Sequence, residues 1–177
     1  ILNYVQQVGK DELLKSVLIH KSWSNDNAWT SYQIGEAFYS KNDFTNASLF
    51  YKNAIQLSPY NTEFKNKMGS VLLSQNKTTD AIKVFEEILA ETPQNIQAIT
   101  NLGYTNLLIG KVTEADRLYA MGLKLEPDYE PLLMNVAGLY IFKKQYKEAI
   151  SVLNTVISRN PKNIQAKQVL EQLKSIH

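Results

Sequence analysis

The chain has 177 residues, of which 44% are hydrophobic and 20% are charged, a composition typical of a folded domain rather than a disordered segment. Its 19 basic and 17 acidic side chains leave a net charge of +2, so no strong overall field favours binding to nucleic acid or to an anionic membrane. The absence of cysteine excludes disulfides and thiolate metal sites, and no apolar run approaches the ~18 residues that a membrane span needs.

The first 27 residues follow the pattern of the remaining chain least well. Leu13, Leu14, Val17 and Leu18 recur at helical spacing, which predicts an amphipathic helix over 11–22. We interpret residues 1–27 as a degenerate repeat or a helical cap, with Asp26 or Asn27 as the N-cap of the next helix. Because the chain begins at an isoleucine rather than a methionine, we expect a piece of a longer protein without its targeting signals. The sequence therefore does not indicate in which cellular compartment the protein acts.

From residue 28 the chain reads as four consecutive segments, each predicting two helices joined by a short turn. The segments are 28–61, 62–95, 96–129 and 130–163. The predicted helix pairs are 28–41 with 44–57, 62–75 with 78–91, 96–109 with 112–125, and 130–143 with 146–159. A proline ends each second helix, since proline cannot continue a helix. Asn61, Asn95 and Asn163 are predicted N-caps, and Gly110 suits a left-handed helix end.

The last residues, 164–177, predict one more helix. Val169, Leu170, Leu173 and Ile176 form an apolar stripe, and the opposite face is polar. A helix with one buried face and one solvent-exposed face is typical of the helix that caps a stack of helical hairpins. The alternative is that this segment is the first helix of a fifth segment.

The four segments are copies of one unit, because three residue types recur with the same spacing. Pro93 follows Pro59 by 34 residues, and the same step leads on to Pro127 and Pro161. Alanines and small residues keep the same register: Ala47, Ala81, Ala115 and Ala149, and Gly35, Gly69, Gly103 and Ala137. Large side chains stand in the second helices where they would face the small ones: Tyr51, Phe85, Tyr119 and Leu153. This periodicity predicts an all-α tandem array of helical hairpins.

These residues resemble the tetratricopeptide repeat, whose pattern is W-x2-L-G-x2-Y, then A-x3-F, then P over ~34 residues. The resemblance covers 28–163 and implies a right-handed helix-turn-helix solenoid. One departure is Asn106, a polar residue where the other copies place Phe38, Leu72 and Tyr140. Further departures are Ile88, Gly122 and Val156, which stand where the family usually has another alanine. If Asn106 is buried, it needs hydrogen-bond partners.

The resemblance also implies where a partner would bind. In this family the first helices line a concave groove, and their equivalent positions in this chain define ten candidate peptide-binding residues. They are Trp29, Tyr32, Gln33, Asn66, Lys67, Gln97, Asn101, Tyr104, Met134 and Asn135. The same set of positions also includes Glu36, Tyr39, Ser40, Glu63, Ser70, Leu73, Ser74, Thr100, Leu107, Leu108, Pro131, Gly138, Ile141 and Phe142.

The candidate groove is rich in amides and aromatic rings and poor in charge. The basic residues with which some family members bind a terminal carboxylate are missing. Asn101 and Asn135 instead resemble the asparagines with which other members hold a peptide backbone, because an amide both donates and accepts. The alternative is that these polar side chains only solvate the groove.

No catalytic or metal-binding pattern is visible. His20 and His177 stand without a second ligand or a nucleophile at motif spacing, so we predict neither an enzyme, nor a cofactor, nor a metal site. We expect a module that binds a protein or peptide partner and neither nucleic acid nor membrane. A structural role stays open, in which the array self-associates as a homo-oligomer or positions other domains, such as an enzyme. RNA binding ranks third, since the groove lacks basic residues.

Overall fold

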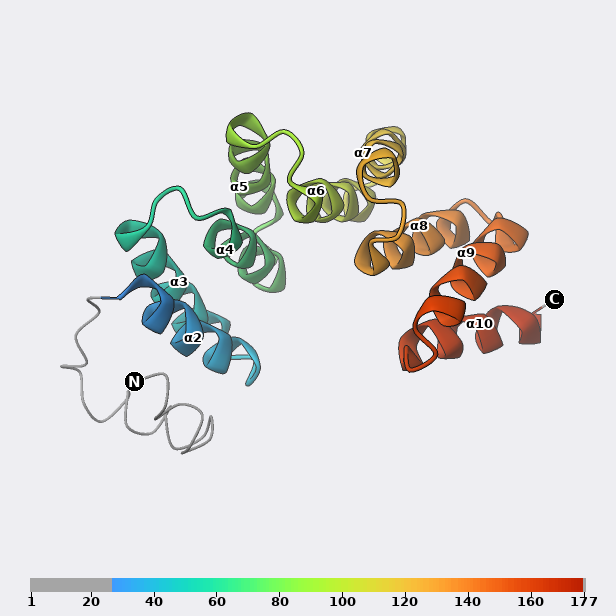
Figure 1. The fold of residues 1–177 in the computed structure, drawn as a ribbon, viewed down its shortest axis with the longest axis horizontal. Coiled ribbons are helices and arrows are strands. Elements are labelled where there is room, and N and C mark those ends of the chain that lie inside the picture. The colour runs from blue at the N-terminus through green and yellow to red at the C-terminus, as the bar shows by residue number, and fades with distance from the viewer. Residues whose placement is uncertain (1–26, 177) are drawn as a thin grey trace. The chain divides into compact units, whose positions relative to one another are not determined.

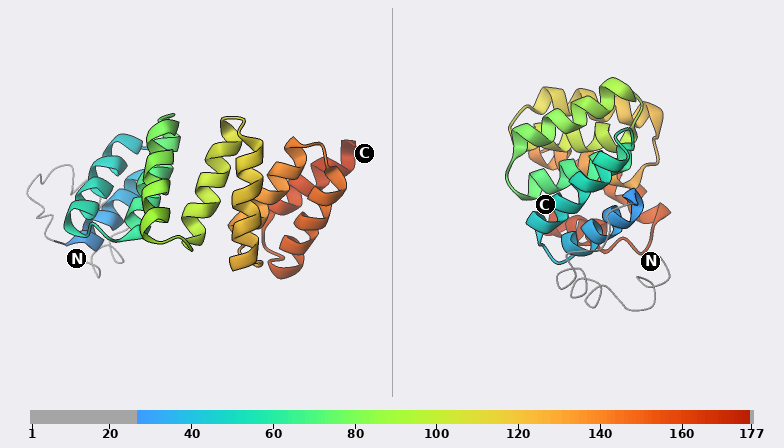
Figure 2. Two further views of the ribbon diagram at one scale, coloured as in Figure 1. Left: turned by 90° about the horizontal axis from the view of Figure 1, so that it is seen from above. Right: turned by 90° about the vertical axis from the view of Figure 1, so that its left-hand side faces the viewer.

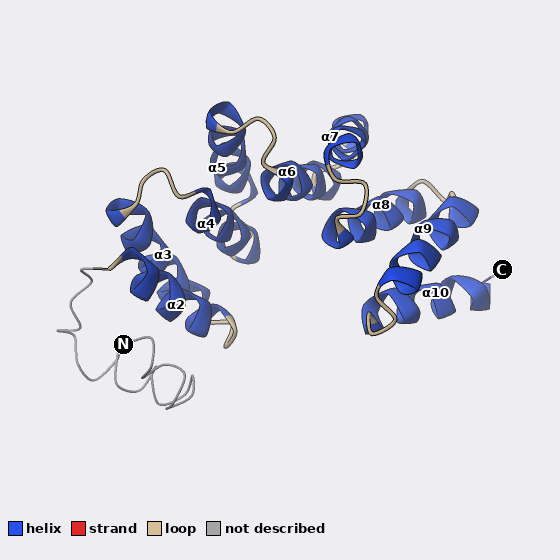
Figure 3. Cartoon of the chain, viewed as in Figure 1, coloured by secondary structure: helices blue, strands red, loops and turns tan. Residues whose placement is uncertain are grey.

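A computed structural model describes residues 27–176 of the chain. The predicted helix at 11–22, the interpretation of residues 1–27 and both histidines lie outside the described residues. Within the described range all regular secondary structure is α-helical (Figure 3).

The helices, labelled as in Figure 1, follow one another in antiparallel hairpins that are visible in Figure 2. Their bounds are α2 Ala28–Tyr39, α3 Phe44–Leu57, α4 Thr62–Ser74, α5 Thr78–Glu91, α6 Ile96–Leu108, α7 Val112–Leu125, α8 Glu130–Phe142, α9 Tyr146–Arg159 and α10 Ile164–Ile176. The second helix of every repeat begins and ends at the predicted residues. The first helices end one or two residues earlier than predicted.

A common turn explains the earlier ends. Asn42, Asn76, Gly110 and Lys144 occupy equivalent positions, and all four have positive φ angles between 59° and 77°. In the last of these turns the Lys144 N–H donates to the Ile141 carbonyl at 2.9 Å, and the Gln145 N–H donates to the Tyr140 carbonyl at 2.8 Å. This pair of bonds is the Schellman motif, which closes a helix through one left-handed residue. The left-handed conformation predicted at Gly110 is confirmed. At the three other positions it was not predicted, because they carry residues other than glycine.

We expect the Lys144→Gly variant to be more stable than the parent by roughly 1 kcal/mol. A left-handed conformation costs a non-glycine residue about 1–2 kcal/mol, and the greater entropy of glycine in the unfolded chain offsets part of the gain. Urea unfolding measures the difference. Asn76→Gly is the matched control and should gain less, because asparagine tolerates this conformation better than lysine. Equal stability of Lys144→Gly and the parent would contradict the expectation.

Asparagine side chains begin four of the helices, as predicted. The Asn27 Oδ1 accepts from the Trp29 N–H at 2.9 Å, and Asn61, Asn95 and Asn163 cap α4, α6 and α10 in the same way. Each cap satisfies backbone donors that have no partner within the helix. Of the two residues predicted as the N-cap of α2, Asn27 is the one that caps it.

The small residues of the first helices lie against the large residues of the second helices. A Cβ atom built on Gly35 would lie 2.6 Å from a ring carbon of Tyr51, and one on Gly69 would lie 2.4 Å from Phe85. On Gly103 the same atom would lie 2.3 Å from Tyr119. Since no real Cβ tolerates such contacts, glycine is what allows an aromatic ring between the two helices. In the fourth repeat, Ala137 is paired with the smaller Leu153.

The chain divides into two compact units between Ile88 and Leu89, in the last part of α5. In the N-terminal unit, Tyr51 and Phe64 are fully buried between α2, α3 and α4. The core of the C-terminal unit continues from α6 through α10, where Ala166, Leu170 and Leu173 are buried in the cluster that includes α9 residues. Asn106 is buried in this unit, and its amide donates to the Leu102 carbonyl at 2.9 Å, so it has the partner that its burial requires.

Candidate functional site

In the N-terminal unit, several candidate residues lie against the protein itself. Tyr32 is only 8% exposed, and its hydroxyl donates to the Glu63 carboxylate at 2.8 Å. Burial and this hydrogen bond raise the pKa of Tyr32 well above its usual value. Trp29 packs edge-on against the rings of Tyr32 and Phe64, with centroids 5.4 and 5.0 Å away. These contacts tie α2 to α4 within the N-terminal unit.

A polar network continues these contacts. The Lys67 ammonium pairs with the Glu36 carboxylate at 2.8 Å, and the other oxygen of that carboxylate accepts the hydroxyl of the buried Tyr51. Asn66 is 4% exposed, and Gln33 is half-buried. The N-terminal unit therefore uses its candidate positions mostly for contacts between its own repeats.

The equivalent positions of the C-terminal unit form a pocket. It has a volume of about 330 Å³ and lies between α6 and α8, which are in contact. Its lining residues come from one face of each helix: Tyr104, Leu107, Leu108, Met134, Asn135, Gly138 and Phe142. Three of them, Tyr104, Met134 and Asn135, are among the ten candidate residues. We call this pocket the α6/α8 groove.

The α6/α8 groove exposes apolar surface, and its lining residues carry no charged side chain. Tyr104, Leu108 and Phe142 are 41%, 56% and 58% exposed, although all three are large hydrophobic residues. Clustered apolar side chains that remain in water are typical of surfaces that bind another molecule. Asn135 is the polar side chain among them and is half-buried.

The remaining candidates of this unit lie on α6, outside the lining of the groove. Asn101 is half-buried, and Gln97 is exposed. Thr100 is 2% exposed and donates its hydroxyl to the Ile96 carbonyl at 2.7 Å. Tyr32, Asn66 and Thr100 share one position in their repeats, so this position faces the protein in three of the four copies. Burial leaves these three residues no surface for a ligand.

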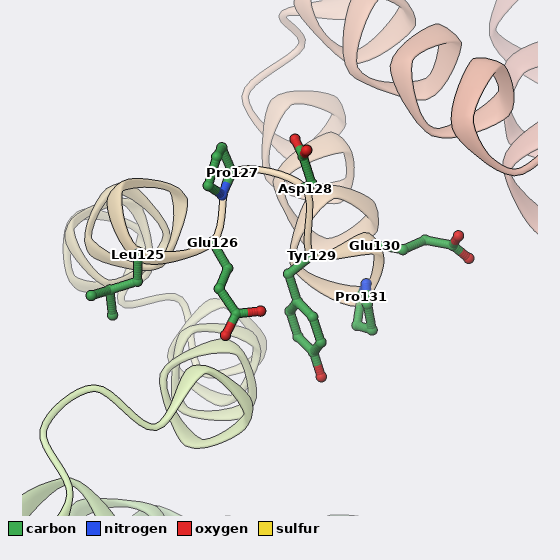
Figure 4. A pocket seen from close by; sticks show the side chains of 7 residues that line it. All are labelled: Leu125, Glu126, Pro127, Asp128, Tyr129, Glu130 and Pro131. Atoms are coloured by element: carbon green, nitrogen blue, oxygen red, sulfur yellow. The ribbon is translucent and has the colours of Figure 1, made fainter.

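A second concave region lies at the connection between α7 and α8 and has a volume of about 610 Å³. Its lining is the continuous segment 125–131, in which the Glu126 and Tyr129 side chains point to one side and Asp128 points away from them (Figure 4). Asp128 pairs with Arg159, and the Glu130 carboxylate accepts from the Asn160 and Asn163 amides at 2.9 and 2.8 Å. These carboxylates already pair with residues at the end of α9 and in the connection to α10, so the larger region is the weaker candidate for a binding site.

Clusters of metal ligands and membrane-spanning helices are both absent from the described residues. Across residues 27–176, the Asp and Glu side chains form no cluster of three or more that could hold a metal ion. In the same part of the chain, every helix is too short or too polar to cross a bilayer.

Comparison with known proteins places the chain among helical repeats. The family model described as tetratricopeptide repeat matches residues 38–102, 72–130 and 107–173, which together cover well over half of the chain. A comparison with curated proteins found no match.

Solved structures of similar fold point the same way. TTC0263, a thermophilic TPR protein of Thermus thermophilus, superposes with a TM-score of 0.75 at 16% identity, over 82% of this chain and 80% of that one. MamA 41-end from Desulfovibrio magneticus RS-1 gives 0.68 at 17% identity, with 92% of each chain covered. YrrB, described as a TPR protein with an unusual peptide-binding site, gives 0.62 at 18% identity, over 96% of this chain and 88% of that one.

At these identities the structural matches show a shared fold. Together with the family model and the repeated glycine, alanine and proline positions, they lead to one conclusion: this chain belongs to the tetratricopeptide repeat family.

Proposed function

We propose that the α6/α8 groove binds an extended, uncharged segment of a partner protein. As a tetratricopeptide repeat protein, the chain is a protein-interaction module, and the proposal concerns where and how it binds. The observation that carries it is the group of exposed apolar side chains around Asn135. A volume of this size falls in the range of ligand pockets, which combine an apolar lining with a few polar groups that fix orientation.

Asn135 and Asn101 would hold the backbone of the bound segment. They occupy the same position in neighbouring repeats, on α8 and α6. A primary amide offers a peptide unit both a donor and an acceptor, so it binds an extended chain independently of its sequence. Tyr104, Leu108 and Phe142 would contact apolar side chains of the segment. The peptide-binding site described for YrrB supports this at the level of the fold, because YrrB is a related repeat array.

Selection from a displayed library of random peptides, followed by affinity measurement on the selected peptide, tests the proposal. Asn101→Ala combined with Asn135→Ala should weaken binding about tenfold or more, since a typical hydrogen bond contributes about 0.5–1.5 kcal/mol. The control pair is Lys162→Ala with Lys167→Ala, at exposed positions near the C-terminal end. It should change the affinity little, and raising the salt concentration should also have a small effect, because the groove lining is neutral.

Two outcomes would contradict the proposal. A larger loss for the lysine pair would indicate an anionic ligand at the C-terminal end. A peptide whose affinity is unchanged in the asparagine pair would place the binding site elsewhere. Sedimentation analysis separates the structural alternative, because self-association through stacked repeats makes the apparent mass depend on concentration.

A further inference from the structure

In the first two repeats, two donors from different helices bind the oxygens of one carboxylate. The carboxylate of Glu36, on α2, accepts the hydroxyl of Tyr51 through one oxygen and the ammonium of Lys67 through the other, the latter at 2.8 Å. Tyr51 is fully buried, and Glu36 gives its hydroxyl the hydrogen-bond acceptor that a buried donor needs. One phenol from a second helix and one side chain from the next repeat thus converge on a single acceptor.

The C-terminal unit has equivalents of both hydrogen-bond donors in this arrangement. Two repeats further along, Tyr119 replaces Tyr51 and Asn135 replaces Lys67. The Tyr119 ring lies against Gly103 as the Tyr51 ring lies against Gly35. The third partner differs, because the position of Glu36 is occupied by Tyr104, which lines the α6/α8 groove.

The change from glutamate to tyrosine leaves a donor without its acceptor. Tyr119 is 1% exposed, and its hydroxyl makes no hydrogen bond to any residue from 27 to 176. The Tyr119 ring packs against Gly103, the residue next to Tyr104, and Tyr104 lines the groove. Burial raises the pKa of Tyr119, and the Tyr104 phenol raises it further. Buried polar groups almost always have partners, so this hydroxyl indicates an acceptor that the described chain does not supply.

We propose that the Tyr119 hydroxyl and the Asn135 side-chain amide jointly bind a backbone carbonyl oxygen of the peptide in the α6/α8 groove. This inference rests on the proposed function and names the polar contact within it. The acceptor is a carbonyl rather than a carboxylate, because the ammonium of Lys67 is replaced by the neutral amide of Asn135. Tyr104, 41% exposed, turns outward to admit the carbonyl and packs against the flanking side chain of the peptide.

The proposal makes stability and affinity change in opposite directions. Tyr119→Phe removes an unpaired buried hydroxyl from the free protein, so the midpoint of urea unfolding should rise. The same change removes a donor to the ligand, so the affinity should fall roughly three- to tenfold. Phenylalanine fits this position, as the fully buried Phe85 of the second repeat shows.

The matched control is Tyr51→Phe, at the equivalent position in the N-terminal unit. Here the hydroxyl has its acceptor in Glu36, so its loss should lower the unfolding midpoint and leave peptide affinity unchanged. If Tyr119 had a purely structural role, Tyr119→Phe would also leave the peptide affinity unchanged, as Tyr51→Phe does.

The probe is N-acetyl-leucyl-leucine methylamide, which offers neutral carbonyls and apolar side chains, titrated into the full chain and followed by NMR at the Asn135 side-chain amide. We expect saturable shifts in the parent, weaker binding by Tyr119→Phe, and weaker binding of the free acid N-acetyl-leucyl-leucine. Equal affinity of Tyr119→Phe and the parent overturns this inference alone, provided that the asparagine pair still weakens binding. Tighter binding of the free acid overturns the choice of a carbonyl. Absence of shifts with either compound counts against the groove itself.

Discussion

Replacing Gly69 with alanine is expected to destabilise the protein by about 1–3 kcal/mol, the usual cost of overpacking a core. The added Cβ would lie 2.4 Å from two ring carbons of Phe85, a side chain that is fully buried. Because the ring is fully buried, it can make room only by displacing its closely packed neighbours. Gly103→Leu should cost more, because a larger side chain would meet Tyr119 at a site where a Cβ alone already lies 2.3 Å from the ring.

The fourth repeat indicates which second change should rescue the first. There the small residue is already alanine, and its large partner is Leu153 instead of an aromatic ring. We therefore expect Gly69→Ala combined with Phe85→Leu to be more stable than the sum of the two single changes predicts. Residues in direct contact typically show coupling of about 0.5–3 kcal/mol. Urea unfolding of the four proteins of this cycle measures the coupling.

Gly138→Ala is the control for this cycle. Gly138 is also a helical glycine, but a Cβ built on it meets no atom within 4 Å. Alanine should therefore stabilise α8 by about 0.5–1 kcal/mol through its higher helix propensity. If Gly69→Ala were as stable as the parent, the register that pairs small with large residues would be incorrect.

The sequence predicted the fold well because the features that define it are local or periodic. Proline and capping asparagines mark helix ends from within a few residues, and the spacing of 34 residues then aligns all copies. By contrast, the left-handed conformation of Lys144 was not predicted, since lysine has no preference for it. Its helix ends there because the repeat architecture imposes the same turn on every copy.

The site was less predictable, because exposure depends on contacts between helices that are far apart in sequence. Family positions identify the groove face but not which of its side chains another helix covers. Tyr32 is buried because Glu63, 31 residues later, provides an acceptor and Phe64 provides a ring. Tyr104 is instead 41% exposed, and the neutral residues Leu108 and Phe142 beside it are exposed as well. The unpaired Tyr119 hydroxyl was also hidden, since in sequence it looks like the satisfied Tyr51.

Filling the α6/α8 groove should weaken peptide binding strongly without unfolding the protein. Gly138 lines the groove, and open space surrounds the position of its missing Cβ, so a leucine there would project into the volume that a ligand needs. We expect Gly138→Leu to weaken the selected peptide at least about tenfold, since a bound side chain that loses its pocket forfeits about 1.5–3 kcal/mol of burial. Stability should stay equal or rise, because leucine is a far better helix former than glycine.

Ser70→Leu provides the matched control, because Ser70 has the same place in the second repeat and lies in the N-terminal unit. The same apolar side chain is then added at a residue that does not line the proposed site, so peptide affinity should remain at the parental value. This comparison decides where the ligand lies. If Ser70→Leu weakens binding as much as Gly138→Leu, the bound segment extends along the first helices of both units. If neither variant does, the exposed side chains of Tyr104, Leu108 and Phe142 serve another contact, and self-association becomes the better explanation for their exposure.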